Sequence, residues 1–352
     1  MNMPGPQLHP VRLTFEGANA VEIACAENED IVSAAMRHGI LLVSECRQGS
    51  CGACRGFLEE GKYDALLEHS EHALSEYDED EGWILASRLK PRSALVVDFD
   101  YPADRAARLD IDSRPGRIIA LDRVSPTTVR LVVRTLVAQN PLQWKAGQYV
   151  RLHLTQAGLT RPFSVANLSS TARELEFFIR LVPDGRFSKA LTQMRGEGEA
   201  VSVEGPYGNF GLAAECAEPV FVAGGTGLVP VLAMLRQLVI DTPDSQPTLI
   251  FGAANEQELI ALDEIEAVRA CCAALKVEIA VVSPRATWAG VCGTAVDALK
   301  KHLACMTNPQ ESHFYLCGPA AMVAAGRDAI STFRVPEERI HHESFTTNGD
   351  PP

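Results

Sequence analysis

The sequence predicts a multidomain protein of the α+β and α/β classes, with three modules in one chain. Its 352 residues exceed the length of one ordinary domain. From Gly116 to about Leu212, six short strands separated by turn residues predict an antiparallel barrel. After Pro219, strands alternate with helices, which predicts a parallel, doubly wound sheet. A cysteine-rich loop near the N-terminus marks a third, smaller module.

The expected elements give the boundaries of the modules. In the first, residues 11–24 predict a β-hairpin around Gly17, and a helix over 31–38 ends at Gly39. Two apolar runs, 83–86 and 94–99, predict its closing strands. The barrel is interrupted by a helix over 187–194, and the last module has helices from Leu228, near Glu256, beyond Thr294 and from Ala320. We expect domains at 8–101, 114–214 and 215–346, with a linker at 102–113.

The charge and the apolar pattern exclude several classes of partner. A net charge of −13 disfavours nucleic acid and anionic membranes. No apolar run approaches the roughly 18 residues that span a bilayer, and the N-terminal residues lack a signal-peptide pattern, so we expect a cytoplasmic protein. Residues 1–100 hold 18 Asp or Glu and 8 Lys or Arg. This acidity provides either solubility or a face that docks a basic partner protein.

Three cysteines have the spacing of an iron–sulfur site. Cys46, Cys51 and Cys54 form C-x4-C-x2-C, the plant-type [2Fe–2S] spacing, in a glycine-rich loop. Glycines let such a loop wrap around a compact cluster. A zinc site is the alternative, but a second distant cysteine pair is missing. The other seven cysteines are scattered, as expected of small buried residues in a reducing compartment.

The fourth ligand position departs from the plant-type pattern. Plant-type ferredoxins carry another cysteine about 30 residues further on. The matching segment here, residues 82–88, has Ser87 at that position, and no cysteine lies between Cys54 and Cys216. Three interpretations stay open: Ser87 binds iron through oxygen, solvent completes three protein ligands, or the substitution cripples the cluster.

Two segments of the barrel predict flavin binding. Arg161-Pro162-Phe163-Ser164 is close to the R-x-Y-S/T motif of flavin-binding reductases, with Phe in place of Tyr. Arg161 offers charge-assisted bonds to a pyrophosphate, Phe163 an aromatic face, and Ser164 a hydrogen bond to the flavin edge. Gly185-Arg186-Phe187-Ser188 opens the inserted helix, whose free amides suit the pyrophosphate of FAD.

Two turns at strand ends predict a nicotinamide dinucleotide site. Gly224-Gly225-Thr226-Gly227 follows a strand and begins a helix, although it is not the G-x-G-x-x-G fingerprint. Phe314–Pro319 ends another strand, so Cys317 is either a buried structural thiol or a contact to the nicotinamide ring. The end of the second strand, residues 252–256, offers an acid and no base for a 2′-phosphate, which favours NADH over NADPH.

With these motifs in this order, the chain resembles the ferredoxin–NADP-reductase-like oxidoreductases with an N-terminal [2Fe–2S] domain. These proteins are reductase components of multicomponent oxygenases. Within the group the chain is most similar to the reductase of soluble methane monooxygenase and related diiron hydroxylases, through CRQGSCGAC, RPFSVANL, RLVPDGRFS and VAGGTGLVPV. The resemblance implies a β-grasp-like ferredoxin domain, an antiparallel FAD-binding barrel and a doubly wound NAD-binding domain.

The resemblance also implies which residues bind the cofactors, and it requires no acid–base catalytic residue. The cluster ligands would be Cys46, Cys51 and Cys54, with Ser87 at the fourth position. FAD would be held by Arg161, Phe163, Ser164, Gly185, Phe187 and Ser188. NADH would be held by Gly225, Thr226, Gly227 and Cys317, and the C-terminal aromatic Phe345 would cover the flavin.

The implied activity is electron transfer from NADH, through FAD and a [2Fe–2S] cluster, to the hydroxylase of a diiron monooxygenase. A monomer is expected. Two alternatives stay open. The chain could serve a Rieske-type aromatic-ring dioxygenase, because the same modules occur there. It could also be a cluster-deficient NADH dehydrogenase or docking module, which Ser87 favours.

Overall fold

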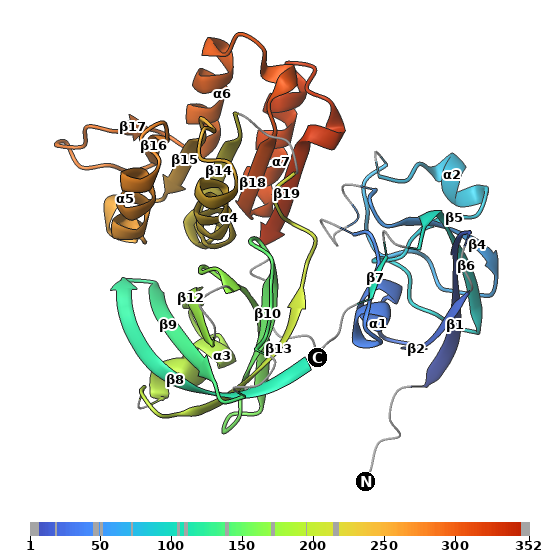
Figure 1. Cartoon of the computed structure of the whole chain (residues 1–352). Coiled ribbons are helices and arrows are strands. Elements are labelled where there is room, and N and C mark those ends of the chain that lie inside the picture. Colours follow the sequence, from blue (N-terminus) through green and yellow to red (C-terminus); the bar gives the residue numbers. More distant parts are fainter. Residues whose placement is uncertain are drawn as a thin grey trace. The chain divides into compact units, whose positions relative to one another are not determined.

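The computed structural model describes residues 7–17, 20–44, 49, 52–71, 73–103, 106–108, 112–137, 141–169, 173–194, 196–213 and 218–345. The chain divides into two compact units, Met1–Ile111 and Asp112–Pro352 (Figure 1). Within the described ranges, no helix has both the length and the apolar character needed to cross a bilayer.

The first unit is a mixed five-stranded sheet with helix α1 packed on it. The strand order is β2-β1-β6-β4-β5, with β1 parallel to β6 and the other neighbours antiparallel. Alternate side chains of β1 and β6 are buried, and Phe15 stacks on Phe99 across the pair at 5.6 Å. The elements are β1 Leu8–Glu16, β2 Val21–Ala26, α1 Ile31–Arg37, β4 Arg55–Glu60, α2 Glu76–Asp80, β5 Trp83–Leu85 and β6 Leu95–Pro102.

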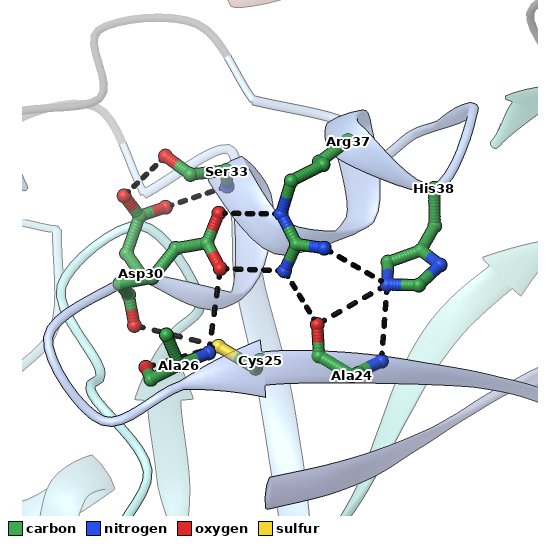
Figure 2. A network of polar contacts seen from close by, with 8 residues as sticks. Ala24, Cys25, Ala26, Asp30, Ser33, Arg37 and His38 are labelled. Atoms are coloured by element: carbon green, nitrogen blue, oxygen red, sulfur yellow. Dashed lines mark hydrogen bonds and ion pairs between the residues drawn. The ribbon is translucent and has the colours of Figure 1, made fainter. Parts of the chain in front are cut away.

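Polar contacts hold both ends of α1, and those of its last turn join the helix to β2 (Figure 2). Asp30 caps the helix by accepting a hydrogen bond from the Ser33 amide at 2.9 Å. In the last turn, Arg37 donates to the Ala24 carbonyl of β2 at 2.6 Å and forms an ion pair with Glu29 at 2.7 Å. The predicted hairpin and helix of this unit are therefore both present.

The second unit begins with six antiparallel strands in a barrel-like sheet, ordered β11-β10-β13-β8-β9-β12 (Figure 1). Side chains on one face of these strands, among them Leu131, Leu152 and Phe177, form one apolar core. The elements are β8 Asp112–Ser125, β9 Thr128–Thr135, β10 Tyr149–Leu154, β11 Leu159–Ser164, β12 Glu174–Arg180, α3 Arg186–Gln193 and β13 Ala200–Tyr207. The predicted antiparallel barrel is confirmed.

The rest of the unit is a six-stranded, fully parallel sheet ordered β17-β16-β15-β14-β18-β19. Helices α4 and α5 cover one face and α6 and α7 the other, which confirms the doubly wound prediction. The strands are β14 Val220–Gly224, β15 Thr248–Ala253, β16 Lys276–Val281, β17 Val291–Cys292, β18 Phe314–Pro319 and β19 Ile340–Phe345. The helices are α4 Leu228–Asp241, α5 Leu262–Cys271, α6 Ala295–Cys305 and α7 Ala320–Ser331, with 3-10 turns at Gly225–Gly227 (η2), Glu256–Glu258 (η3), Pro309–Glu311 (η4) and Glu337–Arg339 (η5).

In two places the structure differs from the sequence-based expectation. The segment expected as a linker contains β7, Ala107–Arg108, which pairs with β3, Ile40–Leu41. The helix expected near Glu256 begins only at Leu262, because η3 is a single 3-10 turn and Ala261 has a left-handed φ of 53°. Short bridges and turns of this kind leave no periodicity in the sequence.

Polar side chains join the barrel to the parallel sheet. Glu258, on η3, accepts a hydrogen bond from Ser125 Oγ at 3.1 Å and another from the Thr127 hydroxyl. On α4, Arg236 forms an ion pair with Glu176 of β12 at 3.3 Å. Because a carboxylate acceptor makes stronger hydrogen bonds than a neutral one, the Glu258 contacts are expected to stabilise this boundary.

Replacing Glu258 with Ala removes the acceptor that both barrel hydroxyls share. We expect the free energy of unfolding of the second unit to fall by about 1–3 kcal/mol, measured by urea unfolding followed by circular dichroism. Glu266→Ala is the matched control, because its side chain is 66% exposed and its ion pair with Arg269 lies within one helix. A loss no larger than that of the control would contradict the role given to Glu258.

Candidate functional site

Two side chains predicted as cluster ligands face each other inside the first unit. The Cys54 Sγ and Ser87 Oγ atoms lie 3.1 Å apart, and the two residues are 3% and 4% exposed. Cys54 belongs to the apolar core cluster of this unit, which also contains Ala73, Leu74 and Leu89. Cys46 and Cys51, the other two predicted ligands, lie outside the described residues. Among the residues that are described, no three His, Cys, Asp or Glu side chains cluster as a metal site.

The glycines beside these cysteines allow a close approach of a second segment. Gly49 and Gly52 have left-handed φ values of +75° and +73°. A Cβ on Gly49 would lie 2.5 Å from His69 Cβ, and one on Gly52 would lie 3.1 Å from the Ala73 carbonyl oxygen. The Ser70 amide also donates to the Gly49 carbonyl at 2.8 Å. The close approach of these two backbone segments, beside a buried sulfur and a buried oxygen, fits a compact thiolate-held cluster.

The two predicted flavin segments come together on the barrel. Strand β11 contacts α3, and the Phe163 ring lies 5.2 Å from the Phe187 ring. Partial burial and the neighbouring guanidinium of Arg186 lower the pKa of Arg161. Arg186 is the first residue of α3, where the helix dipole also disfavours a positive charge. Two cations gathered at a helix N-terminus fit a doubly charged pyrophosphate.

The remaining flavin residues have structural contacts of their own. Gly185 caps α3, and a Cβ there would lie 3.1 Å from the Val182 carbonyl oxygen, so a side chain would fit only tightly. The Ser188 hydroxyl accepts a hydrogen bond from the Val182 amide at 2.9 Å. Ser164 is 8% exposed at the end of β11. Gly185 and Ser188 therefore shape the turn that precedes α3 as well as lying beside the predicted phosphate site.

The two predicted nicotinamide turns meet at the sheet's topological switch point. Strand β14 pairs with β18, so Ala223 lies opposite Cys317. A Cβ on Gly227 would lie 2.1 Å from the Cys317 carbonyl oxygen, so only glycine fits there. Gly225 has a φ of +55°, and Gly225 and Thr226 remain partly exposed. Ligands of doubly wound sheets bind at such a switch point.

Cys317 and Phe345 lie on the face of the sheet that α4 covers. Cys317 is fully buried, and Phe345 packs at the edge of the same apolar cluster. Register places Cys317 opposite Glu343 on β19. Burial raises the pKa of the Glu343 carboxyl to about 7, and its Oε2 has no hydrogen-bond partner among the described residues. Burial and the Glu343 carboxylate raise the pKa of Cys317 well above its usual value.

Sequence reasoning missed two residues, Arg186 beside the predicted flavin site and Glu343 beside the predicted nicotinamide site. Arg186 could have been recognised from the sequence, because a cation in the first turn of a helix opposes the helix dipole and suggests an anionic ligand. Glu343 stands two residues before Phe345, but only the β18–β19 pairing places it beside Cys317.

Three features together define a modular flavin reductase. They are a mixed-sheet module with closely spaced cysteines, a barrel with two cations at a helix N-terminus, and a doubly wound sheet with glycine turns at its switch point. Three domain-family models match the chain in the same order. A "2Fe-2S iron-sulfur cluster binding domain" matches residues 14–91, an "Oxidoreductase FAD-binding domain" matches 115–211, and an "Oxidoreductase NAD-binding domain" matches 221–328.

Known proteins with the same modules are similar over most of the chain. The toluate 1,2-dioxygenase electron transfer component of Pseudomonas putida is 30% identical over 340 residues, covering 97% of this chain and 99% of the relative. Methane monooxygenase component C of Methylosinus trichosporium is 37% identical over 281 residues, covering 78% and 82%. The crystal structure of the Amycolatopsis cytochrome P450 reductase GcoB matches with a TM-score of 0.77, at 25% identity, over 96% and 99%. The chain belongs to the family of FAD-, NAD- and [2Fe–2S]-binding electron-transfer reductase components of oxygenases.

Replacing Arg161 with Ala removes one of the two cations at the N-terminus of α3. A charge-assisted hydrogen bond contributes about 1.5–3 kcal/mol, so we expect FAD to bind roughly 10- to 100-fold more weakly. The flavin retained after gel filtration, and its dissociation constant by fluorescence, measure this. Arg180→Ala, an exposed residue of β12, is the control. Full flavin retention by the Arg161 variant would contradict the assignment.

Glu343 predicts a pH-dependent stability. Because its folded pKa of about 7 lies above the usual 4.5, the folded chain holds the proton more tightly than the unfolded chain between these values. The stabilisation contributed by the protonated Glu343 carboxyl is therefore fully present below about pH 4.5. It is lost as the pH rises through about 7, and the free energy of unfolding falls by at most about 3 kcal/mol.

Glu343→Gln removes the free-energy cost of ionising a buried carboxyl at neutral pH. The variant should gain stability over the wild type between pH 5 and pH 8, measured as the difference in melting temperature at each pH, whereas the exposed Glu338→Gln should not. A Glu343→Gln difference that does not change with pH would contradict the shift.

Proposed function

We propose that this chain passes electrons from NADH, through FAD and a [2Fe–2S] cluster, to the hydroxylase of a diiron monooxygenase. The observation that carries the proposal is the order of the three modules in one chain, together with 37% identity to methane monooxygenase component C. Similarity to the toluate dioxygenase component is lower, at 30%. The greater similarity to a monooxygenase component favours the diiron partner.

When bound, these groups supply hydride acceptance from NADH and release of single electrons. The residues of the chain hold and orient them. We assign Arg161 and the α3 amides, with Gly185 and Ser188 shaping the turn, to the FAD pyrophosphate. The remaining flavin contacts in the proposal are Phe163 and Phe187, whose rings are neighbours, Ser164 at the flavin edge and Phe345 over the ring. Cys46, Cys51 and Cys54 are assigned to the cluster.

The dinucleotide is assigned to the switch point of the parallel sheet. The backbone of Gly225, Thr226 and Gly227 would hold its phosphates, and Cys317 would lie beneath the nicotinamide. Beyond the end of β15, the Glu256 carboxylate accepts a hydrogen bond from the Arg285 amide at 3.0 Å and lies 3.5 Å from its Nε atom. Because Glu256 pairs with Arg285, the nearby base, a 2′-phosphate would meet the Glu256 carboxylate. This arrangement supports a preference for NADH.

The same proposal includes the working form of the protein. We place its domains at 8–101, 114–214 and 215–346, joined by residues 102–113. All three binding modules occur in one chain, so the proposed form is a monomer. The scattered cysteines suit a reducing, cytoplasmic location.

A second function has support of its own. The toluate dioxygenase component covers nearly the whole chain, at 97% and 99% of the two lengths, so a Rieske-type dioxygenase is the alternative electron acceptor.

The purified chain tests both the pathway and the partner. We expect NADH-dependent reduction of ferricyanide, which needs only the flavin, and of cytochrome c, which needs the cluster. Product formation should follow when the chain is combined with a methane-monooxygenase-type hydroxylase and NADH. Ferricyanide reduction alone would support the cluster-deficient alternative, and turnover only with a Rieske-type oxygenase would reassign the partner.

A further inference from the structure

Strand pairing holds Cys54 and Ser87 next to each other. Strand β4 begins one residue after Cys54, and β5 ends two residues before Ser87. The two strands are antiparallel, with Arg55 opposite Leu85, and the Ala86 amide donates to the Cys54 carbonyl at 2.9 Å. The backbone ladder therefore fixes both side chains at the same end of the strand pair.

The distance between the two side-chain atoms suits two ligands of one metal. Tetrahedral metal sites have metal–sulfur and metal–oxygen bonds of about 2.3 Å and about 2.0 Å, which place the two ligand atoms roughly 3.5 Å apart. The observed separation of Sγ and Oγ is 3.1 Å. Both residues are at least nine-tenths buried, so the oxygen is held within the core, away from bulk solvent.

No cysteine of the described part of this unit can replace Ser87. Cys25 is the other described thiol there, and it lies on β2, at the opposite edge of the sheet from β5. Burial, with Glu29 and Asp30, raises the pKa of Cys25 to about 12, which keeps it a neutral thiol. In the sequence, no cysteine stands between Cys54 and Cys216.

We propose that Ser87 Oγ binds the same iron as Cys54 and completes the protein ligands of the [2Fe–2S] cluster. In this step the Oγ–H bond is replaced by an Oγ–Fe bond, the proton leaves to solvent, and no electron is transferred. The proposal rests on the proposed function only in requiring that the cluster is present. It selects direct oxygen ligation over solvent ligation and over a crippled cluster.

An oxygen ligand changes the electron affinity of the cluster. An alkoxide is a harder ligand than a thiolate and favours ferric over ferrous iron. The reduction potential of the cluster in this chain is therefore lower than it would be with a fourth cysteine. A lower potential makes the cluster a stronger electron donor to the partner protein.

Ser87→Cys in the full-length protein tests the ligand exchange. We expect wild type and variant to contain the same iron and acid-labile sulfide per chain. The variant should have a higher reduction potential in a dye-mediated titration and visible absorption shifted to longer wavelength. Equal potentials and spectra would overturn the proposal.

Two further measurements separate serine from solvent. Ser87→Ala should lose most of its iron, whereas Ser93→Ala, on the turn before β6, should keep it. If the alanine variant does not fold, wild-type protein is reduced in water enriched in the magnetic oxygen isotope, and its electron paramagnetic resonance lines should not broaden. Broadening, or an alanine variant with wild-type iron and potential, would show solvent as the ligand and overturn the proposal.

The flavin readouts keep this test distinct from the proposed function. FAD content should be unchanged in every Ser87 variant, and NADH-dependent ferricyanide reduction should be unchanged in the Ser93→Ala control. Wild-type protein without iron but with full ferricyanide reduction would overturn serine ligation and leave the flavin reductase intact. Loss of FAD and of NADH oxidation in the wild type would instead count against the proposed function.

Discussion

The parallel pairing of β14 with β18, and of β18 with β19, is the constraint on which the nicotinamide half of the protein depends. Parallel strands end at the same edge, so the pairing gathers turns that are about a hundred residues apart in sequence. Their backbones then approach so closely that a Cβ on Gly227 would lie 2.1 Å from the Cys317 carbonyl oxygen. Glycine at this turn is therefore a packing requirement before it is a binding feature.

The first unit uses strand pairing in the same way. Cys54 and Ser87 lie just beyond the Arg55–Leu85 end of the β4–β5 ladder, and both are buried. Burial of polar atoms among apolar side chains costs free energy unless a partner satisfies them. Cys54 and Ser87 satisfy this requirement with each other, whereas Glu343 Oε2 has no hydrogen-bond partner among the described residues.

Charge marks the proposed flavin site. Arg161 and Arg186 raise each other's electrostatic free energy, and Arg186 also opposes the dipole of α3. An arrangement that is unfavourable for the chain alone would become favourable with the proposed pyrophosphate bound beside the two cations. The contacts of Glu258 and Arg236 hold the barrel against the parallel sheet.

The sequence by itself determined the module order, the classes of the two sheets of the second unit and the identity of most proposed ligands. It could do so because period-two strands, strand–helix alternation and close-spaced cysteines are local patterns. Only the tertiary structure placed Ser87 against Cys54, Glu343 beside Cys317 and Arg186 beside Arg161. It also revealed β7 and the late start of α5. These features depend on which strands pair and on single turn conformations, and residue periodicity carries no record of either.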